Sequence, residues 1–323
     1  MKVAVGIDIG GTNIVWGFVD QQGVVQAQGN FLTADFSTPA EFVRTTSNAI
    51  NEVIQNNSDF QLSGIGIGAP NGNYFHGTIE DPPNLVWNGI IPIRQMFEGF
   101  FDLPVCLTND ANAAAIGEMQ FGAAKGLNDF VIITLGTGLG SGFVANGNLI
   151  YGHDGFAGEL GHTIVEIDGR KCGCGRRGCL ETYASATGIV RTAKIMLEKH
   201  SGVSLLSELD HITSKNIAVC AEKGDELALQ IFDYTAKKLG FSLANTIAIS
   251  SPEAIILFGG LANAGKLILE PTQRYMEQNL LSLFKNKVKL LLSQVPEKNA
   301  AILGAAALVW KTESNNTFVK TST

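Results

Sequence analysis

Residues 3 to 20 read VAVGIDIGGTNIVWGFVD and predict two β-strands joined by a tight glycine turn. The first apolar, β-branched run ends at the GGTN turn of residues 10–13, and a second run starts directly after it. The same pattern returns as ITLGTGLGSGFVANG at residues 133–147. The two stretches align with a single gap, so we expect an internally duplicated chain in which one glycine-turn hairpin opens each half.

The rest of the chain alternates between strand-like and helical patterns. Short apolar runs predict strands, and apolar residues at helical spacing predict the helices between them. This alternation indicates an α/β protein with mixed sheets. The predicted strands are 62–70, 105–110, 254–260 and 288–292, and the predicted helices are 36–55, 111–124, 183–199, 225–250, 264–281 and 299–311.

The length and charge of the chain limit its class. The 323 residues suffice for two domains. A net charge of −7 disfavours nucleic acids and anionic membrane surfaces as partners, because both require clustered Lys and Arg. No apolar run approaches the ~20 residues of a membrane span, and the N-terminus becomes glycine-rich before an export signal can form. We therefore expect a cytoplasmic protein, in which a structural disulfide is disfavoured.

The glycine turns are candidate phosphate sites. A strand that delivers Asp8 into the turn of Gly10, Gly11, Thr12 and Asn13 exposes backbone N–H groups that can bind an anion, and Asp8 would lie where Mg²⁺ accompanies phosphate. An ordinary hairpin turn is the alternative. The second turn, LGTGLGSG, favours phosphate binding because two such turns can hold neighbouring phosphates from opposite sides. LFGGLANAG at residues 257–265 is a further glycine-rich turn, where a nucleoside could approach the backbone closely.

These turns match neither of the common nucleotide-binding motifs. No GxxxxGK[ST] is present, and the glycines lie in hairpins rather than at a strand-to-helix turn. A P-loop enzyme and a nicotinamide enzyme are therefore disfavoured.

A carboxylate follows the predicted strand at residues 105–110. The sequence LTNDANAAA ends this strand at Asn109-Asp110 and then enters a helix, so Asp110 lies at the edge of the sheet where ligands of α/β proteins collect. One interpretation is that Asp110 only caps the helix. The nearby phosphate turns favour the other interpretation, a base that accepts a hydroxyl proton during phosphoryl transfer.

Three of the five cysteines fall within the segment GHTIVEIDGRKCGCGRRGCLET, residues 161–182. Cys172 and Cys174 are too close in sequence for a comfortable disulfide. With Cys179 and His162 they form the Cys₃His set that Zn²⁺ takes in closed tetrahedral sites. Four protein ligands leave no position for a catalytic water, so the sequence predicts a structural zinc site.

Two carboxylates flank the predicted zinc site. Glu159 and Glu181 lie on either side of it in sequence, and a zinc ion on one ring nitrogen of His162 would leave the other nitrogen for a ligand. These three side chains could together bind a polyhydroxylated substrate. The remaining cysteines, Cys106 and Cys220, lie in apolar patterns and are expected to be inert buried thiols.

Three stretches of the sequence resemble the ROK family of sugar kinases and related repressors, most closely its bacterial glucokinases. These stretches are IDIGGTN, the run from ITLGTGLGSGF to YGHDGFAGELGH, and CGCGRRGCLE. The resemblance covers nearly the whole chain, and GELGH followed by CxCGxxGCxE is its most specific part. It implies an actin-like ATPase (ribonuclease H-like) fold, with two α/β domains around a cleft and a zinc-binding knuckle. The implied domains are residues 1–116 plus 308–323 and residues 117–307.

The resemblance also implies roles for particular residues and cofactors. Asp110 would be the catalytic base at the sugar 6-hydroxyl. The sugar-binding residues would be Asn84, Asn109, Asp110, Glu159, His162 and Glu181. Asp8 would hold Mg²⁺, and the ATP-binding residues would be Gly10, Gly11, Thr12, Asn13, Thr137, Gly138, Gly259 and Gly260. Zn²⁺ would be held by His162, Cys172, Cys174 and Cys179. The family further suggests a dimer or tetramer.

One loop departs from the family pattern. Many members read GxPG where this chain has GAPNGNYFHGT at residues 68–78, with Asn71 at the usual glycine. Because this loop lies by the sugar site in the family, the sugar stays open. Glucose is expected, and N-acetylmannosamine, N-acetylglucosamine, fructose and allose are alternatives.

Two other classes of protein are alternatives to a kinase. A non-catalytic sugar sensor would keep the cleft, but the family's repressors carry a helix-turn-helix before the first strand, which here begins at residue 3. We therefore expect no DNA-binding segment. An actin- or chaperone-type ATPase would leave the cysteine cluster unexplained.

Overall fold

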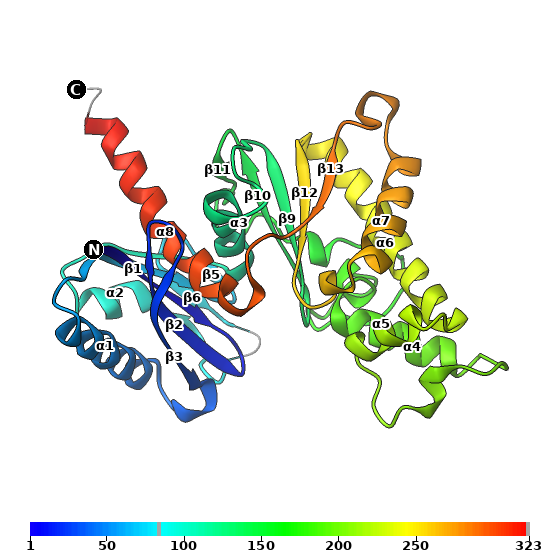
Figure 1. The fold of residues 1–323 in the computed structure, drawn as a ribbon, viewed down its shortest axis with the longest axis horizontal. Coiled ribbons are helices and arrows are strands. Elements are labelled where there is room, and N and C mark those ends of the chain that lie inside the picture. The colour runs from blue at the N-terminus through cyan, green and yellow to red at the C-terminus, as the bar shows by residue number, and fades with distance from the viewer. Residues whose placement is uncertain (83–84, 321–323) are drawn as a thin grey trace. The chain divides into compact units, whose positions relative to one another are not determined.

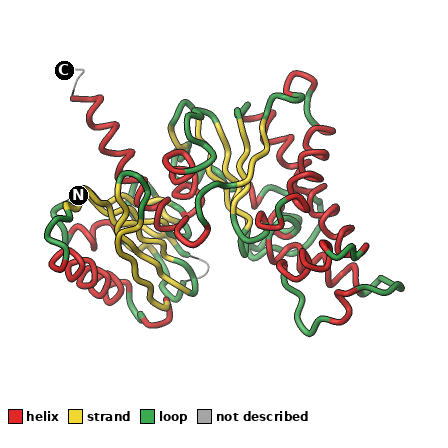
Figure 2. The backbone as a smooth tube through the Cα atoms, in the orientation of Figure 1, coloured by secondary structure: helices red, strands yellow, loops and turns green. Residues whose placement is uncertain are grey.

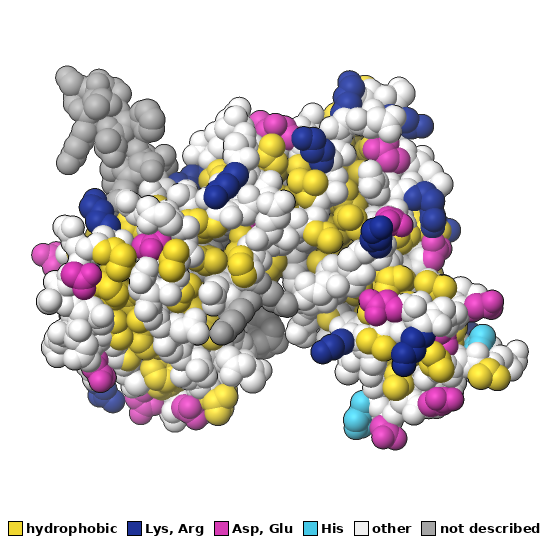
Figure 3. Space-filling view, in the orientation of Figure 1, with side chains coloured by type: hydrophobic (Ala, Val, Ile, Leu, Met, Phe, Trp, Pro, Cys, Tyr) yellow, Lys and Arg dark blue, Asp and Glu magenta, His cyan; other side chains and the backbone are white. Residues whose placement is uncertain are grey.

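The computed structural model describes residues 1–82 and 85–320, which fold into two compact α/β units (Figure 1). The first unit contains residues 1–126, 149–157 and the chain from 294 onward, and the second contains residues 127–148 and 158–293. The domain boundaries near residues 117 and 307 stay a prediction. Acidic and basic side chains are interspersed on the face shown in Figure 3.

The first unit is built on a five-stranded mixed sheet with the order β3-β2-β1-β4-β8. Its strands are β1 (Lys2–Ile9), β2 (Asn13–Asp20), β3 (Val25–Leu32), β4 (Gln61–Gly68) and β8 (Val105–Thr108). The strands β1, β2 and β3 are antiparallel neighbours, whereas β4 and β8 run parallel to β1. The register pairs Asp8 with Gly68 and Gly68 with Thr108, so the three parallel strands end at the same edge of the sheet.

Helices cover both faces of this sheet (Figure 2). The helix α8 packs so closely that a Cβ atom at Gly6 or Gly66 would lie about 2 Å from a backbone oxygen of α8, at 2.0 and 1.9 Å respectively. Glycine at these two positions therefore permits the contact. The helical elements are η1 (Thr33–Asp35), α1 (Pro39–Asn56), α2 (Ile93–Glu98), α3 (Asp110–Phe121) and α8 (Glu297–Lys320), and a small sheet contains β5 (Gly72–Asn73), β6 (Thr78–Glu80) and β7 (Ile90–Ile91).

The second unit is built on another five-stranded mixed sheet, with the order β11-β10-β9-β12-β13. Its helices α4 to α7 lie on one side of the sheet (Figure 2) and share with it an apolar core. The strands are β9 (Phe130–Leu135), β10 (Leu139–Ala145), β11 (Asn148–Leu149), β12 (Ala254–Phe258) and β13 (Lys289–Leu292). The helical elements are η2 (Leu160–His162), η3 (Leu180–Thr182), α4 (Ala186–Leu197), η4 (Leu205–Glu208), α5 (Ser214–Glu222), α6 (Glu226–Ser250), η5 (Ala262–Ala264), α7 (Lys266–Asn279) and η6 (Ser282–Phe284).

The two sheets repeat one topology, which confirms the predicted α/β fold with mixed sheets. An antiparallel glycine-turn hairpin, β1-β2 or β9-β10, is followed in each sheet by two parallel strands beside its first strand. The structure adds β3, β11, α2, α5 and the small sheet, none of which was predicted. Among the described residues, no helix is both long enough and apolar enough to span a membrane.

Candidate functional site

The glycine turn of the first unit is held in place by hydrogen bonds around an exposed loop. The N–H of Gly10 donates to the carbonyl of Asn13 at 3.0 Å. From η1, the buried Thr33 donates its hydroxyl to the carbonyl of Gly10 at 2.7 Å and its N–H to that of Thr12 at 3.0 Å. Gly11, Thr12 and Asn13 remain exposed. The turn therefore has a fixed shape and a surface that an anion can reach.

Two carboxylates lie next to this turn, at the edge of the sheet where β1, β4 and β8 end. A Cβ atom at Gly68 would lie 3.4 Å from Oδ1 of Asp8 and 3.8 Å from Cα of Asp110, so both residues border this glycine. Burial, together with the charge of Asp110, raises the pKa of Asp8 to about 7. A cation beside Asp8 would favour its charged form, and carboxylate oxygen is a ligand that Mg²⁺ prefers.

The helix that carries Asp110 is capped by the residue before it. Asn109 is the N-cap of α3, and its side-chain oxygen accepts from the N–H of Asn112 at 2.7 Å. Asp110 is the first residue of the helix, and its side chain is exposed to solvent. Desolvation by the surrounding protein raises the pKa of Asp110, and hydrogen bonds from the N–H of Ala111 and from its own N–H act in the opposite direction. Asp110 is therefore not the helix cap, and its carboxylate is accessible to a ligand.

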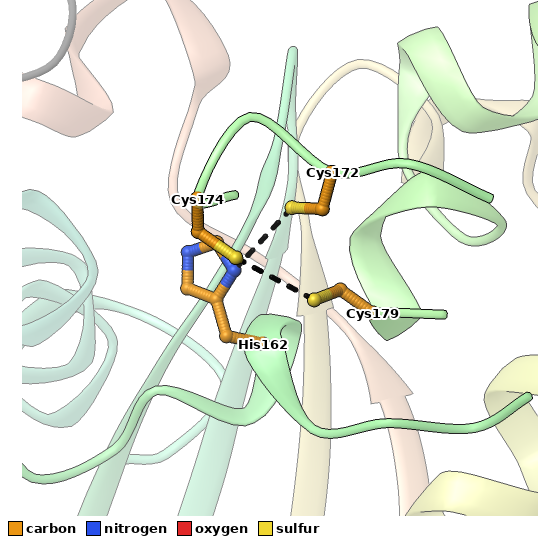
Figure 4. Close-up of side chains that lie close together, drawn as sticks. All are labelled: His162, Cys172, Cys174 and Cys179. Carbon is orange, nitrogen blue, oxygen red and sulfur yellow. Dashed lines mark hydrogen bonds between the residues drawn. The ribbon is translucent and has the colours of Figure 1, made fainter. Parts of the chain in front are cut away.

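The predicted zinc ligands converge in the second unit (Figure 4). One ligand atom from each of His162, Cys172, Cys174 and Cys179 lies within 4.8 Å of all the others. Sγ of Cys174 is 3.7 Å from Sγ of Cys179, and Sγ of Cys172 is 3.7 Å from Nδ1 of His162. A tetrahedral zinc ion with Zn–S bonds of about 2.3 Å separates its sulfur ligands by about 3.8 Å. The four side chains therefore fit a zinc ion.

Short backbone links shape the loop that presents these ligands. The N–H of Cys172 donates to the carbonyl of Arg176 at 2.9 Å, and the N–H of Gly175 donates back to the carbonyl of Cys172 at 3.2 Å. Gly175 has a φ of 87°, which glycine adopts without strain. Desolvation and the carboxylate of Glu181 raise the pKa of Cys172. Desolvation acts in the same direction on Cys174, but hydrogen bonds from Arg176 and the neighbouring thiols lower the pKa of Cys174 to about 6. A bound zinc ion would stabilise all three thiolates.

The two predicted sugar-binding carboxylates lie next to the zinc ligands. Oε1 of Glu181 accepts from Sγ of Cys172 at 2.8 Å and lies 3.7 Å from Nδ1 of His162. Oε2 of Glu159 lies 3.9 Å from the other ring nitrogen, Nε2, of His162. The ring thus has Nδ1 toward the cysteines and Nε2 toward Glu159. A role for His162 in holding both a metal and a sugar stays a prediction.

The second glycine turn reaches the same region. From the start of α4, the N–H of Ala186 donates to the carbonyl of Gly136 at 2.8 Å, and the hydroxyl of Thr187 donates to that of Thr137 at 2.7 Å. A Cβ atom at Gly138 would lie 2.8 Å from Oε2 of Glu181. The turn predicted to bind phosphate therefore adjoins the carboxylate predicted to bind sugar.

The third glycine-rich turn lies beside the end of β9 in the sheet of the second unit. Gly259 has a φ of 99°, and a Cβ atom there would lie 3.1 Å from the backbone of Leu135, at the end of β9. The N–H of Leu261 donates to the carbonyl of Leu135 at 3.0 Å. Gly260 is exposed, and a Cβ atom there would meet nothing within 4 Å. The backbone at Gly260 is therefore accessible to a ligand.

The unusual loop after β4 is well packed within the first unit. Asn71 adopts a φ of 52°, and its side chain donates to the carbonyls of Glu80 and Asp81 at 2.9 and 3.1 Å. Tyr74 stacks on Tyr151 with ring centroids 4.1 Å apart and an interplanar angle of 8°. The aromatic cluster therefore gives a defined shape to the loop that was expected to influence sugar choice.

A side-chain contact connects this aromatic cluster to the strand that leads to Asp110. Tyr151 forms a side-chain hydrogen bond with Thr108, the last residue of β8. The sequence did not single out Tyr151, because its partners lie far away along the chain. Asn84, a predicted sugar-binding residue, lies outside the described residues.

The predicted site residues form one group in each unit. In the first unit, Asp8, the turn of residues 10–13, Asn109 and Asp110 gather at the end of β1 and β8. In the second unit, the turns of residues 136–138 and 259–260 adjoin the end of β9, and the first of them adjoins the zinc region. Their individual roles stay predictions.

The two mixed sheets, each with a glycine-turn hairpin, define an α/β protein with the actin-like fold. The ROK family model matches residues 4–312, and the chain belongs to the ROK family. Over 96% of its length it is 35% identical to a glucokinase of Halalkalibacterium halodurans, and the match covers 96% of that protein. The crystal structure of a ROK family glucokinase from Streptomyces griseus in complex with glucose and AMPPNP is 34% identical, with a TM-score of 0.79, and the match covers 95% of this chain and 98% of that one. The predicted family and fold are confirmed.

Repressors are also among the relatives. A xylose repressor of Caldicellulosiruptor bescii is 33% identical over 77% of this chain, which corresponds to 62% of the repressor. The relatives of this chain thus include both glucokinases and xylose repressors.

Proposed function

We propose that this protein is an ATP-dependent sugar kinase that transfers the γ-phosphoryl group of ATP to the 6-hydroxyl of a hexose, with glucose as the expected substrate. The observation that carries the proposal is the position of Asp110. Its carboxylate is exposed at the sheet edge beside Asp8, and the helix cap is supplied by Asn109. The similarity to glucokinases, one of them crystallised with glucose and AMPPNP, supports the same activity.

Asp110 would act as the general base. It would accept the proton of the sugar 6-hydroxyl as that oxygen attacks the γ-phosphorus in line with the leaving ADP. A base is most effective when its pKa lies near the working pH, and the pKa of Asp110 is raised from the ordinary value of an aspartic acid. Water could replace the sugar hydroxyl as the nucleophile. If the catalytic site assembles only when the sugar is bound, hydrolysis of ATP is prevented.

Asp8 and the glycine turns would hold Mg²⁺ and the phosphates. Mg²⁺ is usually bound through one or two carboxylates, water and the phosphates themselves, and the half-buried carboxylate of Asp8 fits that set. When bound, the ion would neutralise charge on the phosphoryl group. The turns at residues 10–13 and 136–138, which are exposed at residues 11–13 and at Thr137, would orient N–H dipoles toward the phosphate oxygens. The turn at Gly259-Gly260 would accommodate the nucleoside.

The zinc region would bind the sugar. Zinc on Nδ1 of His162 would fix the ring so that Nε2, together with Glu159 and Glu181, forms hydrogen bonds with sugar hydroxyls. The sugar-binding residues expected in the first unit are Asn84, Asn109 and Asp110. A cytoplasmic location and a dimer or tetramer are expected from the family.

Two alternatives follow from specific features. The loop at residues 68–78 departs from the usual GxPG of the family, and its Tyr74 and Phe75 pack with Tyr151. This departure keeps N-acetylmannosamine, N-acetylglucosamine, fructose and allose as alternative substrates. The relationship to xylose repressors supports a non-catalytic sugar sensor as the second hypothesis.

The test is ADP production by zinc-replete protein with Mg-ATP and each of glucose, mannose, fructose, allose, N-acetylglucosamine and N-acetylmannosamine. Strong turnover with one hexose, and only basal ATP hydrolysis without sugar, is the expected result. Saturable sugar binding by calorimetry without turnover of any of them would contradict the kinase and favour the sensor.

A further inference from the structure

The turn that carries Glu181 is held by side chains from two directions. Glu181 lies in the middle of η3, and the hydroxyl of Ser185 donates to its carbonyl at 2.7 Å. On the other side, Nη1 of Arg170 donates to the carbonyl of Thr182 at 2.7 Å. Ser185 is the N-cap of the helix that follows, so its contact is local. Arg170 reaches the turn from the segment of residues 170–179 that carries the three cysteines, here called the zinc loop.

Arg170 is itself fixed by packing against aromatic rings. Its guanidinium carbon lies 4.4 Å from the centroid of the buried Tyr183 ring and 5.9 Å from that of Tyr234. Its Nη1 also donates to the carbonyl of Gly188 at 3.2 Å, and its backbone N–H donates to the hydroxyl of Tyr183 at 2.9 Å. The side chain is half-buried, so it cannot easily adopt another rotamer.

These contacts connect the zinc loop to the predicted sugar carboxylate. Arg170 precedes Cys172 by two residues, and Thr182 follows Glu181 directly. The Glu181 carboxylate is already confined, with Cys172 at 2.8 Å and the backbone of Gly138 close by. If η3 shifted, the confined side chain could not return the carboxylate to its position by a change of rotamer, so the carboxylate would move with the backbone.

We propose that Arg170 is a positioning residue for the sugar site: it acts through the carbonyl of Thr182 to hold the Glu181 carboxylate where a sugar hydroxyl binds. The role rests on the proposed kinase function. Lysine would keep the charge, but only the planar guanidinium can donate to carbonyls in a fixed direction while its face packs on a tyrosine ring. The position should therefore require arginine.

The chain offers a matched control at Arg191. Its Nη1 donates to the carbonyl of Lys171 at 2.9 Å, so it is also an arginine bonded to a backbone oxygen of the zinc loop. Arg191 is exposed, and this bond does not reach η3. Replacing it by methionine removes a similar bond without affecting the turn of Glu181.

The experiment compares Arg170→Met, Arg170→Lys and Arg191→Met with the wild type in steady-state kinetics, together with the zinc content of each protein. For Arg170→Met we expect the sugar KM to rise about tenfold, because a hydrogen bond that involves a charged group contributes a free energy of that size. The KM for ATP should change by less than about twofold. Zinc content should stay at the wild-type value because all four ligands remain. The sugar KM of Arg170→Lys should lie between those of the wild type and Arg170→Met, and the sugar KM of Arg191→Met should equal that of the wild type.

The remaining outcomes overturn the role. An unchanged sugar KM in soluble Arg170→Lys or Arg170→Met would contradict it directly. A fall in kcat that follows loss of zinc, with both KM values unchanged, would show that Arg170 only stabilises the fold. Wild-type protein that phosphorylates no sugar would overturn the proposed function itself, and the role of Arg170 with it, so the two failures are distinguishable.

Discussion

The glycine-turn hairpins of the two units share one sequence pattern but have different neighbours. The turn at residues 10–13 is held by the buried Thr33 and adjoins the carboxylates of Asp8 and Asp110. The turn at residues 136–138 is held by the start of α4 and adjoins Glu181 and the cysteine cluster.

This difference indicates how the duplicated halves could divide the chemistry. The first hairpin lies among acidic groups that suit Mg²⁺ and a general base. The second lies beside a metal knuckle that suits the recognition of hydroxyl groups. Changes to one hairpin should therefore affect different measured quantities from changes to the other.

Removal of zinc should have the largest effect and should be confined to the second unit. A structural zinc ion contributes on the order of 10 kcal/mol to the segment that it organises, so chelation should abolish sugar phosphorylation. Hydrogen exchange should accelerate over residues 162–182 and stay slow in β1 and β2. Cys179→Ala should lower the zinc content, whereas Cys106→Ala should keep it. Full activity in zinc-free protein would contradict this assignment.

Asp8→Asn should change both catalysis and the pH dependence of stability. Loss of the carboxylate should lower Mg²⁺-dependent turnover at least tenfold. Because the pKa of Asp8 is raised to about 7 in the folded protein, its ionisation opposes folding, and the wild type should lose stability as pH rises through 7. Without metal or nucleotide, the stability gained by Asp8→Asn should therefore be larger at pH 8 than at pH 5, by about 2–3 kcal/mol. An equal gain at both pH values in denaturant titrations would contradict the shift.

Gly138→Ala should separate sugar binding from stability in the second hairpin. The new Cβ atom would lie 2.8 Å from Oε2 of Glu181, which is the movable end of a side chain, so the carboxylate should shift while the fold is kept. We expect the sugar KM to rise severalfold with little change in melting temperature. Gly136→Ala is the milder comparison, because its Cβ atom would meet nothing within 4 Å. Equal sugar KM values for the two variants would argue against Glu181 as a sugar ligand.

Thr33→Val and Thr187→Val should produce the smallest effects and compare the two turns directly. Each removes one hydroxyl that donates to a turn carbonyl at 2.7 Å. Thr33 is buried and Thr187 is exposed, so Thr33→Val should cost about 1 kcal/mol of stability and Thr187→Val less. Thermal unfolding checks the order, and a larger loss for Thr187→Val would contradict the contrast between the turns.

The sequence predicted those features that depend on local patterns. Both hairpins follow from β-branched runs around glycines, and the metal cluster follows from the chemistry and spacing of His162, Cys172, Cys174 and Cys179. The strand β3 was missed because one set of alternate residues is only partly buried and the other set is exposed and includes Gln and Asn. The helix α5 was missed because it is short, although Thr213 and Asn216 form a capping box that signals its start.

Other features depend on contacts between residues far apart in sequence. Thr33 at the first turn, Tyr151 beside Thr108 and Arg170 at η3 carry no local motif. The question of which residue caps α3 was also not decided by composition, since Asn109 and Asp110 are both good N-cap residues. The structure assigns the cap to Asn109.

The most direct test of the account is Asp110→Asn, measured for turnover with Mg-ATP and the preferred sugar and for sugar binding by calorimetry. The variant keeps the shape of the side chain and the cap at Asn109, so sugar affinity should stay within about threefold of the wild type. Loss of the general base should lower kcat by ~10² or more. Near-normal turnover in this variant would contradict the assignment of Asp110 as the base and the division of roles between the two units.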